Sequence, residues 1–432
     1  MAEILPLRPW RYHDSPNYTI DELTSPLFDV VSVKQREALY CNPLNSIHLS
    51  VPCGAQPAEE AATLLQAWKD QGILVQDPLP GIYVYYQYFR LPGDEKTYCR
   101  KGFICHIKAY DWQEGVLLRH ENTIPSAVND RIDLLDKTEL NTSPTHGLYT
   151  DNRFILEPYM DESIKSPLYE TEDYQGVRDV LAVIQDHEVL RLFIHTLRDK
   201  QILLADGHHR YEGSLEYRKK IAALNPNHTG FEAYNYHLMY LTNSEHDDLR
   251  ILPTHRVLQS MEMTDEEFLA HLKLYFEVIP KEDPYELNEV IVGKRWAFGL
   301  YLSGNAYKLR LKPEMHNQIT WNFPTEVKDL DLTVMHYFIF EKILGIYRQT
   351  QRNYEGLSYE RNFTACIRKV DMGEARLALI TNDISMEQVK RVCHSGAIMP
   401  QKSTFFYPKV ICGFLFSSIK EDEFVTAAAA CL

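Results

Sequence analysis

The segment over residues 202–217, ILLADGHHRYEGSLEY, most constrains how this chain can fold. Ile202–Ala205 form a short apolar run of the kind found in buried strands. Apolar side chains then recur at helical spacing, at Tyr211, Leu215 and Ala222. We therefore predict a strand over 202–205, a helix over 210–224, and a polar turn between them.

The polar turn, residues 206–210, has the features of an anion site. The first backbone N–H groups of a helix have no partners within the helix, and the helix dipole favours negative charge there. Gly207 permits a tight turn, and Arg210 can bind a phosphate or a carboxylate through two hydrogen bonds. We predict that Gly207, His208 and Arg210 bind phosphate, and that Asp206 holds Mg²⁺ directly or through water.

A purely structural role for this turn is the alternative. Asp206 would then cap the helix, Gly207 would serve the turn, and the two histidines would be solvated. His208 and His209 cannot share one zinc ion, because adjacent helical positions do not face each other. Each histidine therefore has a separate role, and His209 joins Asp206 among the candidate catalytic residues.

Composition narrows the class of protein. The 432-residue chain has 45 basic and 60 acidic side chains, and the net charge of −15 argues against a nucleic acid partner. The eight cysteines are scattered without a Cys-x-x-Cys pair, which favours a reducing compartment. No signal peptide is apparent, and no apolar run reaches the roughly 18 residues that span a bilayer. We expect a cytoplasmic protein without a membrane partner.

The order of predicted elements indicates an α/β (α+β) fold with a mixed-sheet core. We divide the chain into an N-terminal α/β segment with a β-hairpin (1–150), a central core (151–260), an appended α+β unit (261–325) and a C-terminal segment that completes the site (326–432). The hairpin is predicted from two aromatic strands, Gly81–Leu91 and Tyr98–Tyr110, on either side of Pro92-Gly93-Asp94.

Other elements follow from apolar spacing and capping residues. Strands are predicted over Ser46–Val51, Arg153–Leu156, Val177–Ile184 and Tyr234–Thr242. Helices are predicted over His187–Leu197, after a cap at Ser126, after capping boxes at Thr264 and Ser385, and over Glu326–Leu344.

Three further polar clusters stand out from the apolar pattern: His120–Thr123 with Arg131, His255-Arg256, and Lys402-Ser403-Thr404 with Lys409. Together with the turn at 206–210 they contain the groups that phosphoryl transfer needs. We predict Glu121 as the catalytic base. The predicted phosphate contacts are Lys402, Ser403, Thr404 and Lys409. The predicted substrate contacts are His120, Thr123, Arg131, His255 and Arg256.

Each of these clusters has a structural alternative. Glu121 would then be an exposed polar neighbour of His120. His255-Arg256 would be a buried ion pair, and Lys402–Lys409 would be a solvated loop. No P-loop, dinucleotide-binding glycine motif or nucleophile elbow is present in the sequence.

The motif Ala205–Tyr211 closely resembles the hallmark of the prokaryotic domain-of-unknown-function family 1015. Further motifs resemble those of the family in the expected order: Ser25–Val31, His120–Thr123, Asn129–Arg131, Pro253–Arg256 and Met399–Lys409. The chain departs from the common form of the early motif, where Leu27 and Phe28 replace a proline and a tyrosine.

The Asp-Gly-His-His-Arg core is similar to the phosphate-binding motif of the ParB and sulfiredoxin superfamily, which includes nucleotide-dependent kinases of free serine. That resemblance implies a ParB/sulfiredoxin-like mixed-sheet core in which residues 206–210 contact nucleotide phosphates. Sulfiredoxin chemistry needs a cysteine where this chain has His208, and ParB proteins carry DNA-binding helices that are not apparent here.

We therefore expect a kinase that uses ATP or ADP with Mg²⁺ to phosphorylate a hydroxylated small molecule such as free serine. A phosphatase of a phosphoserine-like metabolite and a non-catalytic nucleotide-binding regulator are the alternatives. A homodimer is an assembly that the sequence leaves open.

Overall fold

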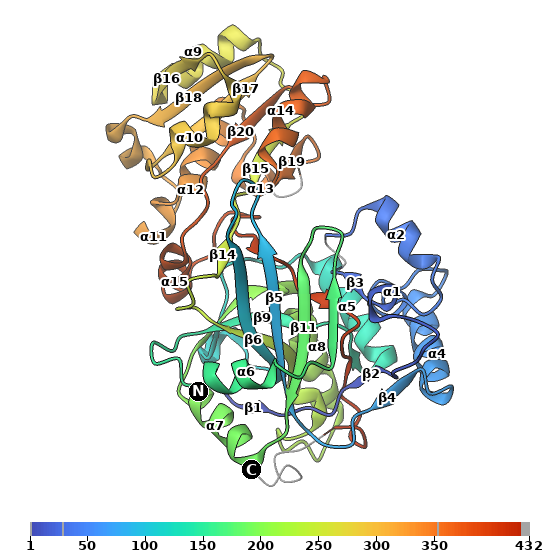
Figure 1. The fold of residues 1–432 in the computed structure, drawn as a ribbon. Coiled ribbons are helices and arrows are strands. Elements are labelled where there is room, and N and C mark those ends of the chain that lie inside the picture. The colour runs from blue at the N-terminus through green and yellow to red at the C-terminus, as the bar shows by residue number, and fades with distance from the viewer. Residues whose placement is uncertain (1, 28–29, 352–353, 425–432) are drawn as a thin grey trace. The chain divides into compact units, whose positions relative to one another are not determined.

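The computed structural model describes residues 2–27, 30–351 and 354–424. The chain divides into two compact units that interleave along the sequence. Unit 1 contains the described parts of Met1–Arg119, Thr123–Leu249 and Pro408–Leu432. Unit 2 contains His120–Asn122 and the described parts of Arg250–Tyr407, which Figure 1 draws mainly in yellow to red.

A nine-stranded mixed sheet forms the centre of unit 1. Its strands, in sheet order, are β10 (Tyr169–Glu172), β11 (Arg178–Ile184), β5 (Ile82–Arg90), β6 (Thr97–Lys108), β13 (Tyr236–Asn243), β9 (Thr145–Tyr149), β12 (Ile202–Asp206) and β7 (Leu117–Leu118), with β1 (Ile4–Leu5) paired to β6. The pairs β13–β9 and β12–β7 are parallel, and the other pairs of the sheet are antiparallel. The expected α/β class with a mixed sheet is confirmed.

The predicted hairpin is β5 and β6, which pair from Tyr83↔Ile104 to Arg90↔Thr97. Gly93, in the connecting turn, has φ +80°, a backbone conformation that glycine adopts readily. Almost every side chain of β5 is buried, as expected for a long aromatic strand covered on both faces.

Several helices and short strands surround this sheet. The helices are α1 (Ile20–Leu23), α2 (Val33–Tyr40), α3 (Ile47–Ser50), α4 (Pro57–Asp70), α5 (Pro125–Thr138), α6 (Glu157–Ser163), α7 (His187–Arg198), α8 (His208–Leu224) and the 3₁₀ turns at 112–114 and 233–235. Three two-stranded pairs complete unit 1: β2 (Trp10–Tyr12) with β4 (Leu74–Gln76), β3 (Ser25–Pro26) with β22 (Ile411–Cys412), and β8 (Leu140–Asn141) with β23 (Ser417–Ser418).

Helices α5 and α8 pack closely against each other. A Cβ atom added to Gly213 of α8 would lie 3.1 Å from Cβ of Arg131 on α5, so the lack of a side chain allows this approach. The contact brings Arg131 beside the helix that follows the 206–210 turn.

Unit 2 is built on a six-stranded antiparallel sheet. The sheet order is β16 (Phe276–Lys281), β18 (Asn305–Leu311), β17 (Ala297–Leu302), β20 (Leu377–Ile380), β15 (His255–Leu258) and β19 (Leu357–Glu360), and a separate pair joins β14 (Arg250–Ile251) to β21 (Phe406–Tyr407). The helices are α9 (Asp265–Tyr275), α10 (Leu287–Ile291), α11 (Thr325–Lys328), α12 (Asp331–Met335), α13 (Arg348–Gln351), α14 (Phe363–Asp371), α15 (Met386–His394), the π-helix η5 (His336–Ile343) and the 3₁₀ turns at 284–286 and 313–318.

The capping boxes predicted in this part of the chain are confirmed. Thr264 accepts a hydrogen bond from the backbone N–H of Glu267, and Ser385 accepts one from Gln388. Each cap satisfies a backbone donor that would otherwise lack a partner at the helix start.

Two predicted strands are wrong because local side-chain bonds favour other structure. Residues 47–50 form α3, since Asn45 Oδ1 accepts from the Ile47 N–H at 2.9 Å and starts a helical turn. Residues 153–156 form a turn, since Asp151 accepts backbone N–H groups of both Arg153 and Ile155. These Asx-type bonds compete with strand pairing.

Two predicted helix features are also wrong. Pro125 occupies the first position of α5, so Ile124 is the N-cap and Ser126 lies inside the helix. The single helix expected over 326–344 is instead α11, α12 and the π-helix. The break precedes Asp331, whose carboxylate accepts the Trp296 N–H at 2.8 Å and ties this point to the sheet.

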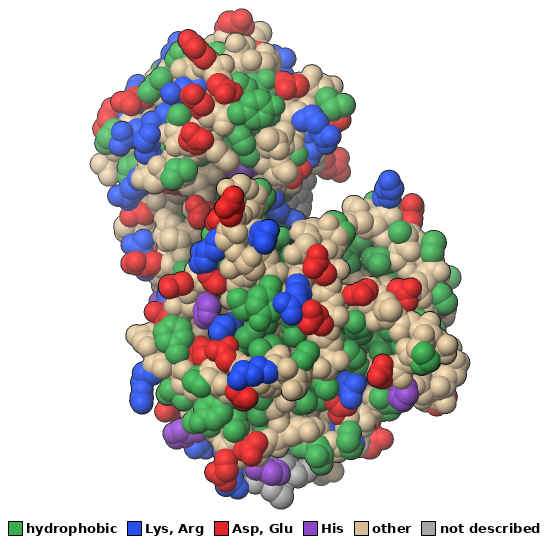
Figure 2. Space-filling model, in the orientation of Figure 1, with side chains coloured by type: hydrophobic (Ala, Val, Ile, Leu, Met, Phe, Trp, Pro, Cys, Tyr) green, Lys and Arg blue, Asp and Glu red, His purple; other side chains and the backbone are tan. Residues whose placement is uncertain are grey.

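The surface of each unit carries both charge signs. Figure 2 shows Asp and Glu side chains interspersed with Lys and Arg on the face that is drawn. Among the described residues, no helix has the length and apolar character that crossing a bilayer would require.

Leu309→Ala tests the core of unit 2. Leu309 is fully buried in a cluster with Phe276, Phe298 and Phe338, so its truncation should lower the free energy of unfolding by about 2–5 kcal/mol. Urea denaturation followed by circular dichroism measures this change. The control is Leu274→Ala, which removes a side chain that is 59% exposed and should cost about 0.5 kcal/mol or less. Equal losses in the two variants would contradict the assigned core.

Candidate functional site

The turn between β12 and α8 places Asp206 between two cations. One carboxylate oxygen accepts from Arg210 Nη2 at 3.1 Å, and the other contacts Lys409 Nζ. Burial alone would raise the pKa of Asp206, but Lys409 and Arg210 outweigh it and hold the pKa well below its usual range. Asp206 is therefore a carboxylate at neutral pH, and it fixes the positions of both cations.

Gly207 is required by the geometry of this turn. It is the N-cap residue of α8 and has φ +88°, in the left-handed region. An added Cβ would lie 2.6 Å from Cγ2 of Thr145 and 2.9 Å from Nη2 of Arg210. A side chain here would disturb both the backbone and the Asp206–Arg210 pair.

Arg210 continues from this ion pair into a pocket of unit 1. Its Nη1 donates to Ser143 Oγ at 3.1 Å and to the Pro144 carbonyl at 2.6 Å. The residue is only 8% exposed, and within the described residues its Nε has no hydrogen-bond partner. Arg210 thus has one buried donor available to a ligand.

The unit 1 pocket has a volume of about 370 Å³, a figure that includes space open to solvent. Its polar lining consists of Arg131, Asn141, Thr142, Ser143, Arg210, Ser214 and His237. Asn141 is 7% exposed, and its side-chain N–H group also lacks a partner in the described part of the chain. Burial lowers the pKa of His237 to about 3, so this ring is neutral at pH 7.

A row of polar side chains crosses one face of the unit 1 sheet. Asp179, Gln87 and Arg100 are directly opposite one another on β11, β5 and β6, so they share a face. Gln87 donates to Asp179 at 2.7 Å and accepts from Arg100. It also donates to the Lys409 carbonyl at 2.9 Å, which connects this row to Asp206.

Arg100 is a buried cation without a carboxylate partner among the residues described. It is 2% exposed, its Nε and Nη1 have no hydrogen-bond partner there, and its Cζ lies 5.5 Å from the centre of the Tyr240 ring. Burial and the charge of Arg100 lower the pKa of the nearby His146 well below its usual range. The interior of unit 1 therefore has more positive than negative charge around Asp206.

The predicted site residues divide between the two units. Asp206, Gly207, His208, His209, Arg210, Lys409, Thr123 and Arg131 belong to unit 1. His120, Glu121, His255, Arg256, Lys402, Ser403 and Thr404 belong to unit 2. Within unit 1, the Asp206 turn is joined to Lys409 by an ion pair and to Arg131 by the shared pocket.

The predicted residues of unit 1 differ in their burial. His208 is 6% exposed and begins α8, whereas His209 is half-buried on the next position of the helix. Thr123 is half-buried just before α5. Arg131 donates to the Ser50 carbonyl at 2.8 Å and pairs with Asp130.

Unit 2 has a second pocket, and one of the predicted residues lines it. Glu121 lines that pocket, and the His120 ring nitrogen bonds Thr404 Oγ1 at 2.8 Å. Arg256 is fully buried and donates to backbone carbonyls of Thr254, Gln401 and Lys402. His255 is buried and accepts the Thr381 N–H at 3.2 Å.

The loop residues of unit 2 differ from one another. Ser403 is buried and donates to the Pro400 carbonyl. Lys402 is exposed, with φ +55°. His255 and Arg256 do not form an ion pair, since both are basic; the ring of His255 is neutral, with a pKa lowered to about 4 by burial.

Sequence reasoning missed Arg100, Asp179, Gln87 and Asn141. Each is an isolated polar residue in or beside an apolar strand or a turn, and none belongs to a recognisable sequence motif. A polar residue inside an otherwise aromatic strand, as with Gln87 in IYVYYQYFR, is the signal that could have found this row.

The residues around Asp206 do not form a metal site built by protein ligands. Both carboxylate oxygens of Asp206 contact cations, Nη2 of Arg210 and Nζ of Lys409. In the described part of the chain, no group of three or more His, Cys, Asp or Glu side chains is arranged to hold a metal ion. These residues suit an anion better than a divalent cation.

The fold and this site define a class: a mixed α/β protein with a buried, donor-rich pocket at the start of a helix. The chain belongs to the family described as Protein of unknown function (DUF1015), whose model matches residues 4–333. The expected family is thereby confirmed. No curated protein matches the sequence.

Several solved structures are distantly similar. A free serine kinase mutant in complex with AMP has a TM-score of 0.38 and 12% identity, over 71% of this chain and 90% of that chain. A conserved hypothetical protein from Pyrococcus furiosus has a TM-score of 0.36 and 14% identity, over 72% and 94%. SbnI with a C-terminal truncation from Staphylococcus aureus has a TM-score of 0.35 and 12% identity, over 74% and 90%. At these TM-scores, function must be argued from the residues of this chain.

Asp179→Asn tests the polar row through the pH dependence of stability. Burial raises the pKa of Asp179 to about 7, against roughly 3.9 in an unfolded chain. Between these values the folded state retains a proton that the unfolded state loses, so wild-type stability should fall as pH rises from 4 to 7, by up to about 4 kcal/mol. Asparagine resembles the protonated acid and should flatten this fall.

Thermal or urea unfolding at pH 5 and pH 8 measures the effect. Asp133→Asn, at an exposed position of α5, is the control and should unfold with the pH dependence of the wild type. If Asp179→Asn also kept that dependence, Asp179 would not be the responsible group.

Proposed function

We propose that this protein is a small-molecule phosphotransferase: a kinase that transfers a phosphoryl group from ATP or ADP to the hydroxyl of a metabolite, with free serine as the first candidate acceptor. One observation carries the proposal. In the unit 1 pocket, Arg210 Nε and Asn141 Nδ2 are buried donors that no described protein group satisfies. Buried donors of this kind are costly unless a ligand accepts from them.

Phosphate is the anion that suits the pocket best. Two arginines, a carboxamide and hydroxyls line it, and α8 begins beside it. A phosphate has several oxygens for these donors and carries the charge that arginine forks and helix starts favour. The resemblance of residues 206–210 to the ParB/sulfiredoxin phosphate-binding motif supports the same assignment.

Asp206 and Lys409 prepare this pocket for its ligand. Asp206 holds Nη2 of Arg210, and Ser143 and Pro144 hold Nη1, so the guanidinium has one orientation before a ligand binds. A preoriented donor loses less conformational freedom on binding than a mobile one. His208 and Gly207 supply the first residues at the helix start, and we assign them to the phosphate as well.

The proposed transfer needs a base for the acceptor hydroxyl. The hydroxyl oxygen forms a bond to phosphorus, the bond from phosphorus to the bridging oxygen of the nucleotide breaks, and the hydroxyl proton moves to a carboxylate. We assign that carboxylate to Glu121 of unit 2, with His209 and the predicted substrate contacts as supporting groups. Because both carboxylate oxygens of Asp206 contact the side chains of Arg210 and Lys409, we assign no step of the transfer to Mg²⁺.

Arg210→Ala tests the phosphate site. Removing a charged donor should weaken binding of ADP, ATP or inorganic phosphate by about 10–100-fold, as expected for a hydrogen bond between charged groups. Asn141→Leu should weaken it by about tenfold without disturbing the Asp206 ion pairs. Isothermal titration calorimetry with and without Mg²⁺ measures these affinities.

The matched control for both variants is Arg178→Ala, which removes an exposed arginine of unit 1 paired with Glu170. It should bind the nucleotide as the wild type does. Absence of nucleotide and phosphate binding in the wild type, or unchanged affinity in both pocket variants, would refute the site.

Glu121→Gln tests the assigned base. The variant should bind nucleotide normally but transfer phosphate to free serine or another hydroxyl acceptor about 10²–10⁴-fold more slowly. Phosphorus NMR of wild-type and variant reactions measures the transfer. Phosphate release from a phosphoserine-like compound without nucleotide would indicate the phosphatase instead, and nucleotide binding without any turnover would indicate a regulator.

A further inference from the structure

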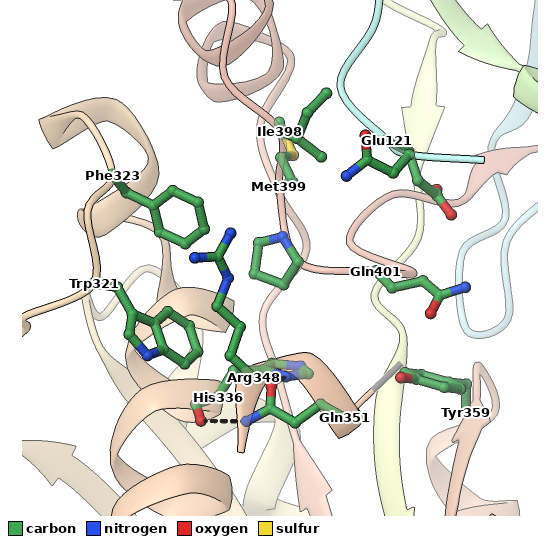
Figure 3. A pocket seen from close by; sticks show the side chains of 12 residues that line it. Glu121, Trp321, Phe323, His336, Arg348, Gln351, Tyr359, Ile398, Met399 and Gln401 are labelled. Carbon is green, nitrogen blue, oxygen red and sulfur yellow. Dashed lines mark hydrogen bonds between the residues drawn. The ribbon is translucent and has the colours of Figure 1, made fainter. Parts of the chain in front are cut away.

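Unit 2 contains a pocket of its own, with an aromatic wall. Its volume is about 660 Å³, a figure that includes space open to solvent. Trp321 and Phe323 lie on one side beside Arg348, whereas Glu121 and Gln401 lie on the opposite side of the view in Figure 3. Arg348 therefore lies against the aromatic side chains, and the Glu121 and Gln401 side chains lie across the pocket from it.

The first polar end is cationic. The Arg348 guanidinium carbon lies 4.2 Å from the centre of the Phe323 ring and 5.7 Å from that of Trp321. Glu341 holds this wall in place, because its carboxylate accepts from both Trp321 Nε1 and the Arg348 backbone N–H at 3.0 Å. Among the described residues, no carboxylate forms an ion pair with the Arg348 guanidinium, so its charge can pair with an acidic ligand.

The floor of the pocket adds positive potential. His336, the first residue of the π-helix, accepts from Arg256 at 3.3 Å and bonds Gln351 at 2.9 Å. Burial lowers the pKa of Arg256 to about 10 and that of His336 to about 3, so at pH 7 the arginine is charged and the histidine is neutral. Arg256 is bonded to backbone carbonyls in place of a carboxylate, and its charge is therefore only partly compensated.

The second polar end includes two acceptor groups. The side-chain oxygen of Gln401 is buried and has no hydrogen-bond donor in the described part of the chain. The carboxylate of Glu121 lines the same side. A ligand group at this end must donate hydrogen bonds, as a hydroxyl or an ammonium does.

We propose that the unit 2 pocket binds a carboxylic acid with a body about the size of one aromatic ring and a hydroxyl or ammonium at the far end. The carboxylate pairs with Arg348, the ring packs against Trp321 and Phe323, and the donor reaches Gln401 and Glu121.

Four small probes test the pocket by isothermal titration calorimetry without nucleotide. 4-Hydroxyphenylacetate has the acid, the ring and the donor; phenylacetate lacks the donor, tyramine lacks the acid, and serine lacks the ring. The first should bind most tightly, and each of the others should bind at least about tenfold more weakly, the loss of one good polar or apolar contact.

Two variants locate the binding. Arg348→Gln should weaken 4-hydroxyphenylacetate at least about tenfold and leave tyramine nearly unchanged. Gln401→Leu should weaken 4-hydroxyphenylacetate and leave phenylacetate nearly unchanged. The control is Arg295→Gln, which removes another arginine stacked on a tryptophan, Trp296, outside this pocket.

The outcomes separate this inference from the proposed function. No saturable binding of 4-hydroxyphenylacetate, or binding that both pocket variants leave unchanged, overturns the unit 2 site even if unit 1 binds nucleotide. Specific binding of the acid, together with no nucleotide or phosphate binding in unit 1, supports the unit 2 site and counts against the kinase.

Discussion

The charge pairing of Asp206 with Arg210 and Lys409 is the interaction on which the geometry of unit 1 depends. In a buried setting each of these charges would be costly alone, and together they compensate one another. The pairing also brings three parts of the chain together: the end of β12, the start of α8 and the segment after residue 408. Arg210 lines the pocket and keeps one donor without a partner among the described residues, so the same contacts that stabilise the fold also orient a residue of the candidate ligand site.

The two pockets show different ways to prepare for a ligand. The unit 1 pocket is polar, and its donors exceed the acceptors that the protein supplies. The unit 2 pocket is largely aromatic and apolar, with one cation and one buried acceptor at its ends. Glu121 belongs to the second pocket, whereas Arg210 and Asn141 belong to the first.

Local sequence signals predicted the parts of this fold that are decided locally. The β12–α8 junction, the β5–β6 hairpin and two capping boxes were all predictable, because glycine, aromatic spacing and caps act over a few residues. The strands predicted at 46–51 and 153–156 failed where one Asn or Asp side chain captured backbone N–H groups. Of the site, the Asp206 turn with Lys409 and Arg131 could be predicted, whereas Gln87 and Arg100 could not, since only strand register makes them neighbours.

The position of Lys409 along the chain has a consequence for synthesis. Most of unit 1 precedes residue 250, but Lys409 emerges from the ribosome only after the whole of unit 2 has been made. Until then Asp206 lacks one of its two cations, and the unit 1 core lacks Val410, Cys412, Phe414 and Leu415. Unit 2 is by contrast almost contiguous and has its own core. The nascent protein thus passes through a period in which the later unit is able to fold before the earlier one is complete.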